Sequence, residues 1–255
     1  MIFYFTGTGN SLFAAKRLLA EGEALVNIAD AIKNNQFEYQ IPAGENVGFV
    51  FPVYFYTVPD IIKDFVSKLK IDGAEYVYAV ITCGGGISQS GAVLKKTLKK
   101  SNIKLDWVTP LLMPDNSMLF YQIPPMEDTP RILSGAEARI EEIKATINKR
   151  ASMSIGNASA ASDIVGLGFK LCENTAKFYA EDSCIGCGLC VKNCPQDVIA
   201  MKDGKPQWTK AKCQKCSACI NRCPKQAIQY GTATKNRNRY VNPEMHDRNN
   251  ENLIS

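Results

Sequence analysis

The chain has 255 residues, a net charge of +5 and an apolar fraction of 45%, which is ordinary for a globular protein of one large or two smaller domains. No stretch approaches the roughly 18 consecutive apolar residues that a membrane span needs, and the first residues lack the basic segment and cleavage site of a secretory signal. We therefore expect a cytoplasmic protein, in which the ten cysteines serve a purpose other than disulfide bonding.

Strand and helix signals alternate through the first 150 residues. Apolar runs predict five strands, at Ile2–Phe5, Ala24–Ile28, Val47–Phe51, Tyr76–Thr82 and Lys104–Leu112. The segments between and after them predict helices at Asn10–Ala20, Pro59–Leu69, Gly91–Lys100 and Thr129–Arg150. Continuous apolar strands that alternate with helices are typical of a parallel sheet covered on both faces, so we expect an α/β, doubly wound five-strand sheet.

The remaining chain divides by composition. Residues 151–162 are small and polar and predict a linker, and Asp163–Ala180 has the apolar spacing of an amphipathic helix that includes Phe178. Eight cysteines follow within a short span, and the last residues are polar and basic. We predict a first domain at 1–150, a linker with a bridging helix at 151–180, a smaller α+β domain at 181–231, and at 232–255 a tail that either wraps the surface or is partly disordered.

The eight clustered cysteines form two copies of one motif, C-x2-C-x2-C-x3-C-P. Three thiolates at this spacing can surround one face of a [4Fe–4S] cluster, while the fourth, before proline, ligates the other cluster. The spacing predicts one cluster on Cys184, Cys187, Cys190 and Cys223, and a second on Cys213, Cys216, Cys219 and Cys194. Zinc is the alternative, but it usually takes paired C-x2-C units or mixed Cys/His sets. The motif resembles that of the bacterial two-[4Fe–4S] ferredoxins over Glu181–Tyr230.

The turn TGTGNS, at Thr6–Ser11, follows the first predicted strand and opens the first predicted helix. Backbone amides and hydroxyls at a helix start can bind an anion. The turn lacks the lysine of a Walker A loop, and Leu12 stands where a Rossmann fingerprint has its third glycine. A phosphate loop without a cation remains, as does a plain glycine turn in which Asn10 or Ser11 caps the helix.

TGTGNS resembles the FMN phosphate loop of the flavodoxins, T/S-x-T-G-N-T/S. The resemblance implies a flavodoxin-like strand order of 2-1-3-4-5, with FMN bound at the carboxyl ends of the strands. Its phosphate would lie against Thr6, Gly7, Thr8, Gly9, Asn10 and Ser11.

Flavodoxins hold the flavin ring with two later loops, which correspond here to PVYFYTVP and TCGGG. The implied ring contacts are Pro52, Val53 and Tyr54, followed by Thr82, Cys83, Gly84 and Gly85. Each of the three aromatic residues at 54–56 could instead belong to the core, and Cys83 reads as a small buried residue. The segment Met113–Ser117 could cap the same pocket or form a simple turn.

The basic charge is concentrated in the last part of the chain, where eleven Lys and Arg residues and three Asp and Glu residues lie between Lys202 and Arg248. Part of this charge would compensate the negative clusters, and part could form a docking face for an acidic redox partner. No aromatic platform accompanies the charge, so we do not expect a nucleic-acid partner.

Together the two motifs resemble the flavodoxin–ferredoxin fusion proteins, which occur mostly in anaerobic bacteria and archaea. The resemblance implies electron transfer between FMN, two [4Fe–4S] clusters and an external redox protein or a small acceptor. The alternatives are a flavin-dependent reductase of a quinone or another small acceptor, and a sensor that responds to cluster loss. The sequence shows no catalytic dyad, and we take His246 and Cys172 as surface and core residues, respectively.

Overall fold

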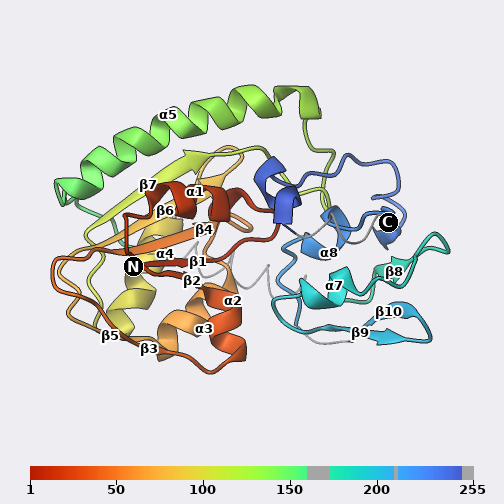
Figure 1. The fold of residues 1–255 in the computed structure, drawn as a ribbon, viewed down its shortest axis with the longest axis horizontal. Coiled ribbons are helices and arrows are strands. Elements are labelled where there is room, and N and C mark those ends of the chain that lie inside the picture. The colour runs from red at the N-terminus through yellow and green to blue at the C-terminus, as the bar shows by residue number, and fades with distance from the viewer. Residues whose placement is uncertain (160–172, 210–211, 249–255) are drawn as a thin grey trace. The chain divides into compact units, whose positions relative to one another are not determined.

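The computed structural model describes residues 1–159, 173–209 and 212–248. Figure 1 shows the order of the helices and strands along this part of the chain. The described residues form two compact units. The first consists of Met1–Thr6, Asn10–Met113 and 130–159. The second consists of Gly7–Gly9, Pro114–Thr129, 173–209 and 212–248, so it includes two segments from the N-terminal half of the chain.

A five-strand parallel sheet is the centre of the first unit. Its strands lie in the order β2-β1-β4-β6-β7. Their bounds are Leu25–Asn27 (β2), Ile2–Tyr4 (β1), Val47–Pro52 (β4), Val77–Cys83 (β6) and Trp107–Leu112 (β7). Counted along the chain, this is the predicted order 2-1-3-4-5, so the predicted α/β fold class is confirmed. The order reverses between β1 and β4, and loops that follow these strands lie at the carboxyl edge of the sheet.

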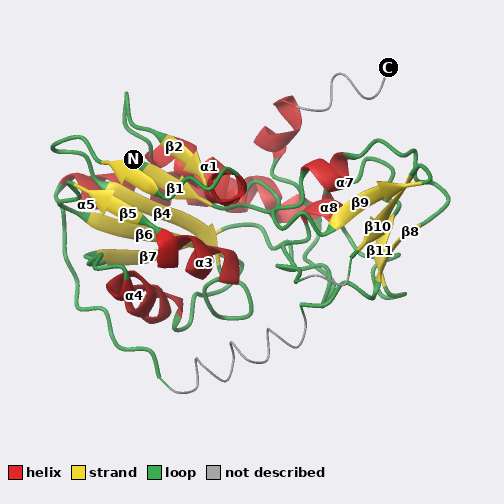
Figure 2. Ribbon diagram, turned by 90° about the horizontal axis from the view of Figure 1, so that it is seen from below, coloured by secondary structure: helices red, strands yellow, loops and turns green. Residues whose placement is uncertain are grey.

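Helices cover both faces of the sheet (Figure 2). Their bounds are Asn10–Leu18 (α1), Ile28–Lys33 (α2), Asp60–Lys68 (α3), Ser90–Lys100 (α4) and Thr129–Asn148 (α5). Two further strands, Glu38–Gln40 (β3) and Lys70–Asp72 (β5), pair with each other outside the main sheet, and a 3-10 turn at Met126–Asp128 (η1) precedes α5. None of the helices in the described part of the chain is long and apolar enough to cross a membrane.

The side chains of each strand alternate between the two faces, so neighbouring residues enter different cores. On one face, Ile2 and Val50 pack with Phe13 of α1 and Ile140 of α5. On the other face, the ring of Phe3 packs against the rings of Phe49 and Phe65, with centroids 5.5 and 5.4 Å apart. These cores bury nearly the whole length of the central strands, which explains why β4 and β6 have no polar alternation.

The second unit is built from short elements. The pair β8 (Phe178–Ala180) and β11 (Ile228–Tyr230) and the pair β9 (Ile199–Lys202) and β10 (Lys205–Trp208) are antiparallel. Two single-turn helices, α7 (Leu189–Lys192) and α8 (Ala218–Asn221), and a final 3-10 turn, η2 (Pro243–Arg248), complete it. The sequence predicted a helix through Ala180. Residues 163–172 of that prediction lie outside the described residues, and its end is wrong, because Phe178 begins a strand that pairs with Tyr230.

A core of eleven buried residues holds these elements together, and only some of them lie near the cysteine motifs in sequence. Met118, Leu119 and Ile123 come from the segment before α5, and Tyr240 comes from the predicted tail. The side chain of Tyr240 is 1% exposed. The polar tail therefore contributes a large core residue between 232 and 248.

One prediction concerns the spacing between two strands of the sheet. A Cβ atom on Gly48 in β4 would lie 2.5 Å from the ring carbon Cζ and the hydroxyl of Tyr78 in β6. Both residues are buried, so the Gly48→Ala variant must displace the ring, and we expect the free energy of unfolding to fall by about 1–3 kcal/mol. Thermal unfolding followed by circular dichroism measures this loss.

Gly135 in α5 is the matched control, because a Cβ atom there meets no atom within 4 Å. The Gly135→Ala variant should be as stable as the parent or more stable by up to about 1 kcal/mol, since alanine favours helix. Equal stability of the parent and the Gly48→Ala variant would contradict the tight packing at this strand pair.

Candidate functional site

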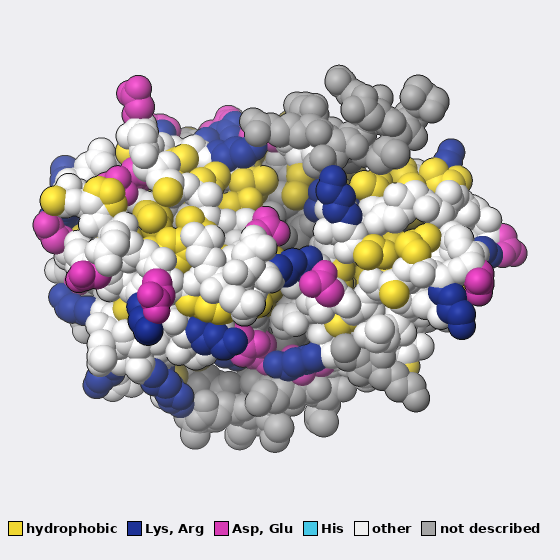
Figure 3. Space-filling view, turned by 60° about the horizontal axis from the view of Figure 1, so that its bottom comes forward, with side chains coloured by type: hydrophobic (Ala, Val, Ile, Leu, Met, Phe, Trp, Pro, Cys, Tyr) yellow, Lys and Arg dark blue, Asp and Glu magenta, His cyan; other side chains and the backbone are white. Residues whose placement is uncertain are grey.

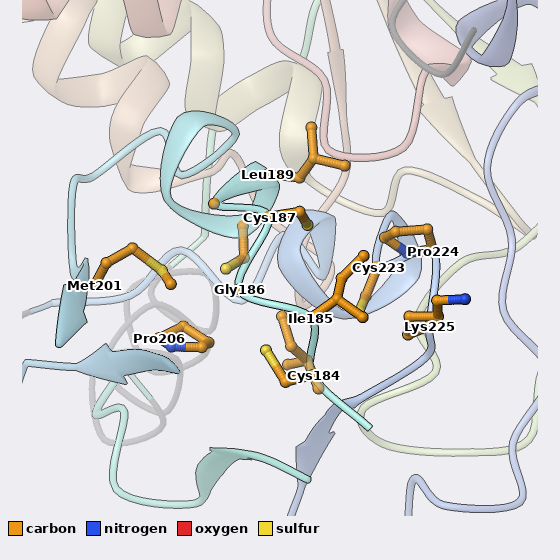
Figure 4. A pocket seen from close by; sticks show the side chains of 13 residues that line it. Cys184, Ile185, Gly186, Cys187, Leu189, Met201, Pro206, Cys223, Pro224 and Lys225 are labelled. Atoms are coloured by element: carbon orange, nitrogen blue, oxygen red, sulfur yellow. The ribbon is translucent and has the colours of Figure 1, made fainter. Parts of the chain in front are cut away.

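Four cysteines line an open cavity in the second unit, whose empty space is about 360 Å³ when the adjoining open solvent is included. They are Cys184, Cys187, Cys190 and Cys223, and Figure 4 labels three of them, Cys184, Cys187 and Cys223. The first three come from one motif, and the fourth comes from the other motif. The rest of the lining is mainly apolar and includes Ile185, Met201 and Ile228.

A second cavity, of about 350 Å³, has a corresponding lining. Its cysteines are Cys194, Cys213, Cys216 and Cys219, and Phe178 and Trp208 form part of its wall. Each cavity is thus lined by one of the two sets of four that the spacing predicts, including the exchange of the fourth cysteine between the motifs.

The backbone at each motif explains how the thiols converge. Gly188 and Ser217 have left-handed φ angles of 73° and 57° and directly precede the single-turn helices α7 and α8. Each helix contains the third cysteine of its motif and ends before the fourth. Gly186 also has a positive φ, and a Cβ atom there would lie 2.7 Å from the carbonyl oxygen of Gly204. Glycine is therefore required at this turn.

Two backbone amides donate hydrogen bonds to cysteine sulfurs. Lys215 N–H donates to Cys213 Sγ at 3.4 Å, and Ala227 N–H donates to Cys223 Sγ at 3.3 Å. Such bonds stabilise a thiolate and are among the interactions that tune the potential of a bound cluster. Both cysteines belong to the second motif, but Cys223 lines the first cavity and Cys213 lines the second, so each cavity has one sulfur that accepts from an amide.

Burial opposes ionisation of several of these thiols. It raises the pKa of Cys190 to about 11 and that of Cys216 to about 12, and it raises the pKa of Cys219 well above its ordinary value. A thiol ligates metal as the thiolate, so the positive charge of bound iron must offset this desolvation. Such a site is expected to gain much of its stability from the metal centre itself.

The shape of the cavities bears on which metal centre they fit. Zinc requires four ligands about 2.0–2.3 Å from a single ion. Each set of four cysteines lines a cavity, and this arrangement fits a cluster of several atoms.

Much of the basic charge has partners inside the second unit. Arg239 donates to the carbonyl oxygens of Ile220, Gln226 and Ile228. The ammonium of Lys215 donates to the carbonyl of Asn174 at 2.6 Å and lies 4.3 Å from the ring centroid of Tyr230. Further basic side chains pair with a carboxylate or a carbonyl, namely Lys205 with Asp182, Lys212 with Glu173, Lys235 with Glu181 and Arg237 with Met118.

On the face of the molecule in Figure 3, Lys and Arg side chains are interspersed with Asp and Glu and do not form one basic field. The hydrogen bonds and ion pairs within the second unit give several of the basic residues a structural role. A docking face for an acidic partner remains a prediction.

The predicted phosphate loop divides between the two units. In the first unit, Asn10 and Ser11 begin α1, and the hydroxyl oxygens of Ser11 and Thr82 lie 2.7 Å apart in a buried hydrogen bond. The first turn of α1 contains no acidic residue, so its amide dipoles favour an anion. Ser11 and Thr82 come from the two loops that were expected to bind the phosphate and the ring, respectively.

Thr8 and Gly9 belong to the second unit and are buried there. The amide of Asn116 donates to the hydroxyl of Thr8, and the backbone N–H of Asn242 donates to the carbonyl of Thr8 at 2.8 Å. Gly9 has a φ of +103°, and a Cβ atom there would lie 2.7 Å from Cβ of Asn242. Neither Asn116 nor Asn242 was a predicted phosphate contact, although Asn116 lies in the segment proposed as a cap.

The first loop expected against the ring forms a tight turn over Tyr54–Thr57. Tyr54, which the sequence favoured, is 8% exposed and packs edge-on against Phe5. Tyr56 is 73% exposed instead. Phe55 and Tyr56 both have left-handed φ angles, of 49° and 57°, which bulky side chains rarely adopt. Strain of this kind concentrates at functional sites, so Tyr56 joins the candidates for flavin contact.

The second ring loop adjoins the first, because the backbone N–H of Val53 donates to the carbonyl of Thr82 at 2.9 Å. Cys83 is buried, and burial raises the pKa of its thiol, as expected of a structural residue and not a nucleophile. Gly84 and Gly85 are exposed, and the position of a Cβ atom on Gly85 is open space. The loop thus leaves its backbone accessible at the carboxyl edge, which fits the close approach of a flavin ring.

Comparison with known proteins identifies the cysteine-rich region. Residues 183–228 match the family described as "4Fe-4S dicluster domain". This part of the chain is therefore an iron–sulfur domain of the ferredoxin type, and electron transfer is the function that it suggests. No curated protein matches the chain.

Among solved structures, the chain is similar to the Trp repressor binding protein from Bacillus subtilis, at 12% identity and a TM-score of 0.28. The match covers 55% of this chain and 95% of that one. The assignment of the fold class rests on the strand order described above.

The contacts of Arg239 generate a prediction. Replacing Arg239 by Met would leave three carbonyl groups without this donor, so we expect the stability of the iron–sulfur domain to fall by about 2–3 kcal/mol. Arg239→Lys should recover only part of the loss, because one ammonium cannot reach three carbonyls as a guanidinium does. Thermal unfolding under anaerobic conditions measures the change. Lys202→Met removes the same charge from an exposed position and should have no effect, so equal losses in both variants would contradict the role of Arg239.

The strained turn generates another prediction. Tyr56→Gly relieves a left-handed φ, so thermal stability should rise by up to about 1 kcal/mol. If Tyr56 contacts the flavin, the same variant should bind FMN more weakly, as measured by the quenching of flavin fluorescence. Unchanged FMN affinity would remove Tyr56 from the ring site, and lower stability would show that the turn is not strained.

Proposed function

We propose that this chain is an electron-transfer protein that carries two [4Fe–4S] clusters and FMN, and that electrons pass between these groups and an external redox partner. The observation that supports it most directly is the pair of cavities, each surrounded by four cysteines in the combination that a two-cluster ferredoxin uses. The match of residues 183–228 to a dicluster family supports the iron–sulfur part of the proposal.

In this proposal each cavity holds one cluster. Cys184, Cys187, Cys190 and Cys223 are the ligands in the first cavity. Cys194, Cys213, Cys216 and Cys219 are the ligands in the second. Apolar walls exclude water, and the amides of Lys215 and Ala227 stabilise the thiolates.

The flavin part of the proposal rests on residues at the carboxyl edge of the sheet, where strand order reverses beside β1 and ligands of this fold class bind. The hydroxyls of Ser11 and Thr82 and the amides at the start of α1 would bind the phosphate, and the accessible glycines at 84 and 85 would face the ring. The first turn of α1 contributes no negative charge that would oppose the phosphate.

The chemistry belongs to the bound groups: a cluster exchanges one electron, and a flavin exchanges one or two. The protein's own residues bind these groups, exclude water and orient them. A reductase of small quinones would need the same groups together with a substrate site, so steady-state quinone turnover tests that alternative directly.

The composition of the anaerobically purified protein tests the proposal. We expect about eight irons and eight sulfides per chain, from two cubanes of four each, and one FMN. Cys187→Ala and Cys216→Ala should each lose iron from a different cavity and keep the flavin. Cys83→Ala is the control, because it removes a buried cysteine that lines neither cavity and should keep all of its iron. A full complement of iron in the Cys187→Ala variant would contradict the ligand assignment, and flavin-free protein after incubation with FMN would contradict the flavin part alone.

A further inference from the structure

Two segments that are distant in sequence from the TGTGNS turn contact Thr8 and Gly9. One is the loop after β7, which contributes Asn116, and the other is the tail, which contributes Asn242 and Met245. All of these residues belong to the second compact unit.

In the hydrogen bond between Asn116 and Thr8, Asn116 is the donor. Its side-chain N–H donates to the hydroxyl oxygen of Thr8, which is 1% exposed. A hydroxyl has one proton to donate, and an oxygen that accepts from an amide directs that proton to a different acceptor. Asn116 therefore sets Thr8 as a hydrogen-bond donor, which is the role that an anionic ligand requires.

The tail fixes the backbone at the same place. The N–H of Asn242 donates to the carbonyl of Thr8, and Cβ of Asn242 and Sδ of Met245 occupy the space beside Gly9. Asn242 is itself 1% exposed, and its side-chain oxygen accepts from the N–H of Glu244 at 3.1 Å. The orientation of the Thr8 peptide is thus held from one side by a well-ordered turn.

Both segments are anchored in the core of the iron–sulfur domain. Asn116 precedes the buried Met118 by two residues, and its carbonyl accepts from the side chain of Asn221 at 3.5 Å. Asn242 follows the buried Tyr240, whose backbone N–H donates to Asn221 Oδ1 at 3.0 Å. Asn221 in α8 therefore links the two anchors, so neither contact depends on an exposed, mobile loop.

We propose that Asn116 is a positioning residue for the phosphate of FMN, and that it acts by orienting the hydroxyl of Thr8. This inference rests on the proposed function, because it needs FMN as the ligand. It adds to the contacts of Thr8 a residue from outside the TGTGNS motif, which belongs to the same compact unit as Thr8.

The experiment compares FMN with riboflavin, which has the same ring and lacks the phosphate. Flavin-depleted protein with its iron content verified is titrated with each compound, and binding is followed by fluorescence quenching. We expect Asn116→Ala to weaken FMN binding about tenfold, the loss of roughly one hydrogen bond to a charged group. Riboflavin binding should change less than twofold, because it makes no phosphate contact. A merely structural role of Asn116 would weaken both compounds equally.

Three further variants test whether Asn116 acts through Thr8. Asn116→Asp replaces the donor by an acceptor and adds negative charge, so FMN affinity should fall further than in Asn116→Ala. Thr8→Ala should show the same selectivity for FMN, and the double variant Thr8→Ala/Asn116→Ala should lose no more than Thr8→Ala alone. Gln122→Ala changes an exposed side chain of the same loop, outside the segment Met113–Ser117, and should bind both flavins normally.

The outcomes separate the two proposals. If the parent protein binds neither flavin, the flavin part of the proposed function fails, and this inference fails with it. If the parent binds FMN and Asn116→Ala has no effect, or affects FMN and riboflavin equally, FMN binding stands and the positioning role is overturned. Additive losses in the double variant would likewise overturn the route through Thr8.

Discussion

The second unit depends on the burial of cysteine side chains around two cavities. A domain of this size has few apolar residues with which to form a core, and several of its buried positions are thiols whose ionisation burial opposes. Iron reverses that balance, because it binds the thiolates that the interior alone would protonate. The requirement to bring four thiolates together at each cavity explains several local features. These are the short helices, the left-handed turns and the N–H···S hydrogen bonds. The metal centres would then supply part of the core that the side chains lack.

In the parallel sheet, the groups that can recognise a ligand are confined to the ends of the strands. Its strands are apolar along their whole length, so the polar groups that can recognise a ligand occur where the strands end. The buried hydrogen bond between Ser11 and Thr82 joins two of these ends, and the bond from Val53 to the carbonyl of Thr82 joins a third. Three loops that the sequence separates by dozens of residues are thereby held as one edge. This is the edge at which doubly wound sheets bind ligands.

Sequence patterns predicted the sheet well because each strand and each helix carries its own local signal. The cysteine sets were equally accessible, since ligand spacing along the chain is itself a geometric constraint, and the structure places both sets around cavities. Residues whose roles depend on tertiary contacts gave no such signal. Phe178 fits an amphipathic helix as well as it fits a strand, and only its pairing with β11 decides the matter. Tyr240 is one aromatic in a polar segment, and nothing local marks it as a core residue. The choice between Tyr54 and Tyr56 depends on a turn with unusual backbone angles, which a run of three aromatic residues does not suggest.

The buried Met118, Leu119 and Ile123 have a bearing on modularity. They precede the last helix of the sheet unit, yet they pack in the core of the iron–sulfur domain. Truncation of the protein after residue 150 would separate these three apolar side chains from their packing partners and leave an exposed apolar patch on the fragment 1–150. A division of the chain at residue 150 therefore does not yield two independently exchangeable domains. A chimeric protein that receives the cysteine motifs would also have to receive the segment 114–129.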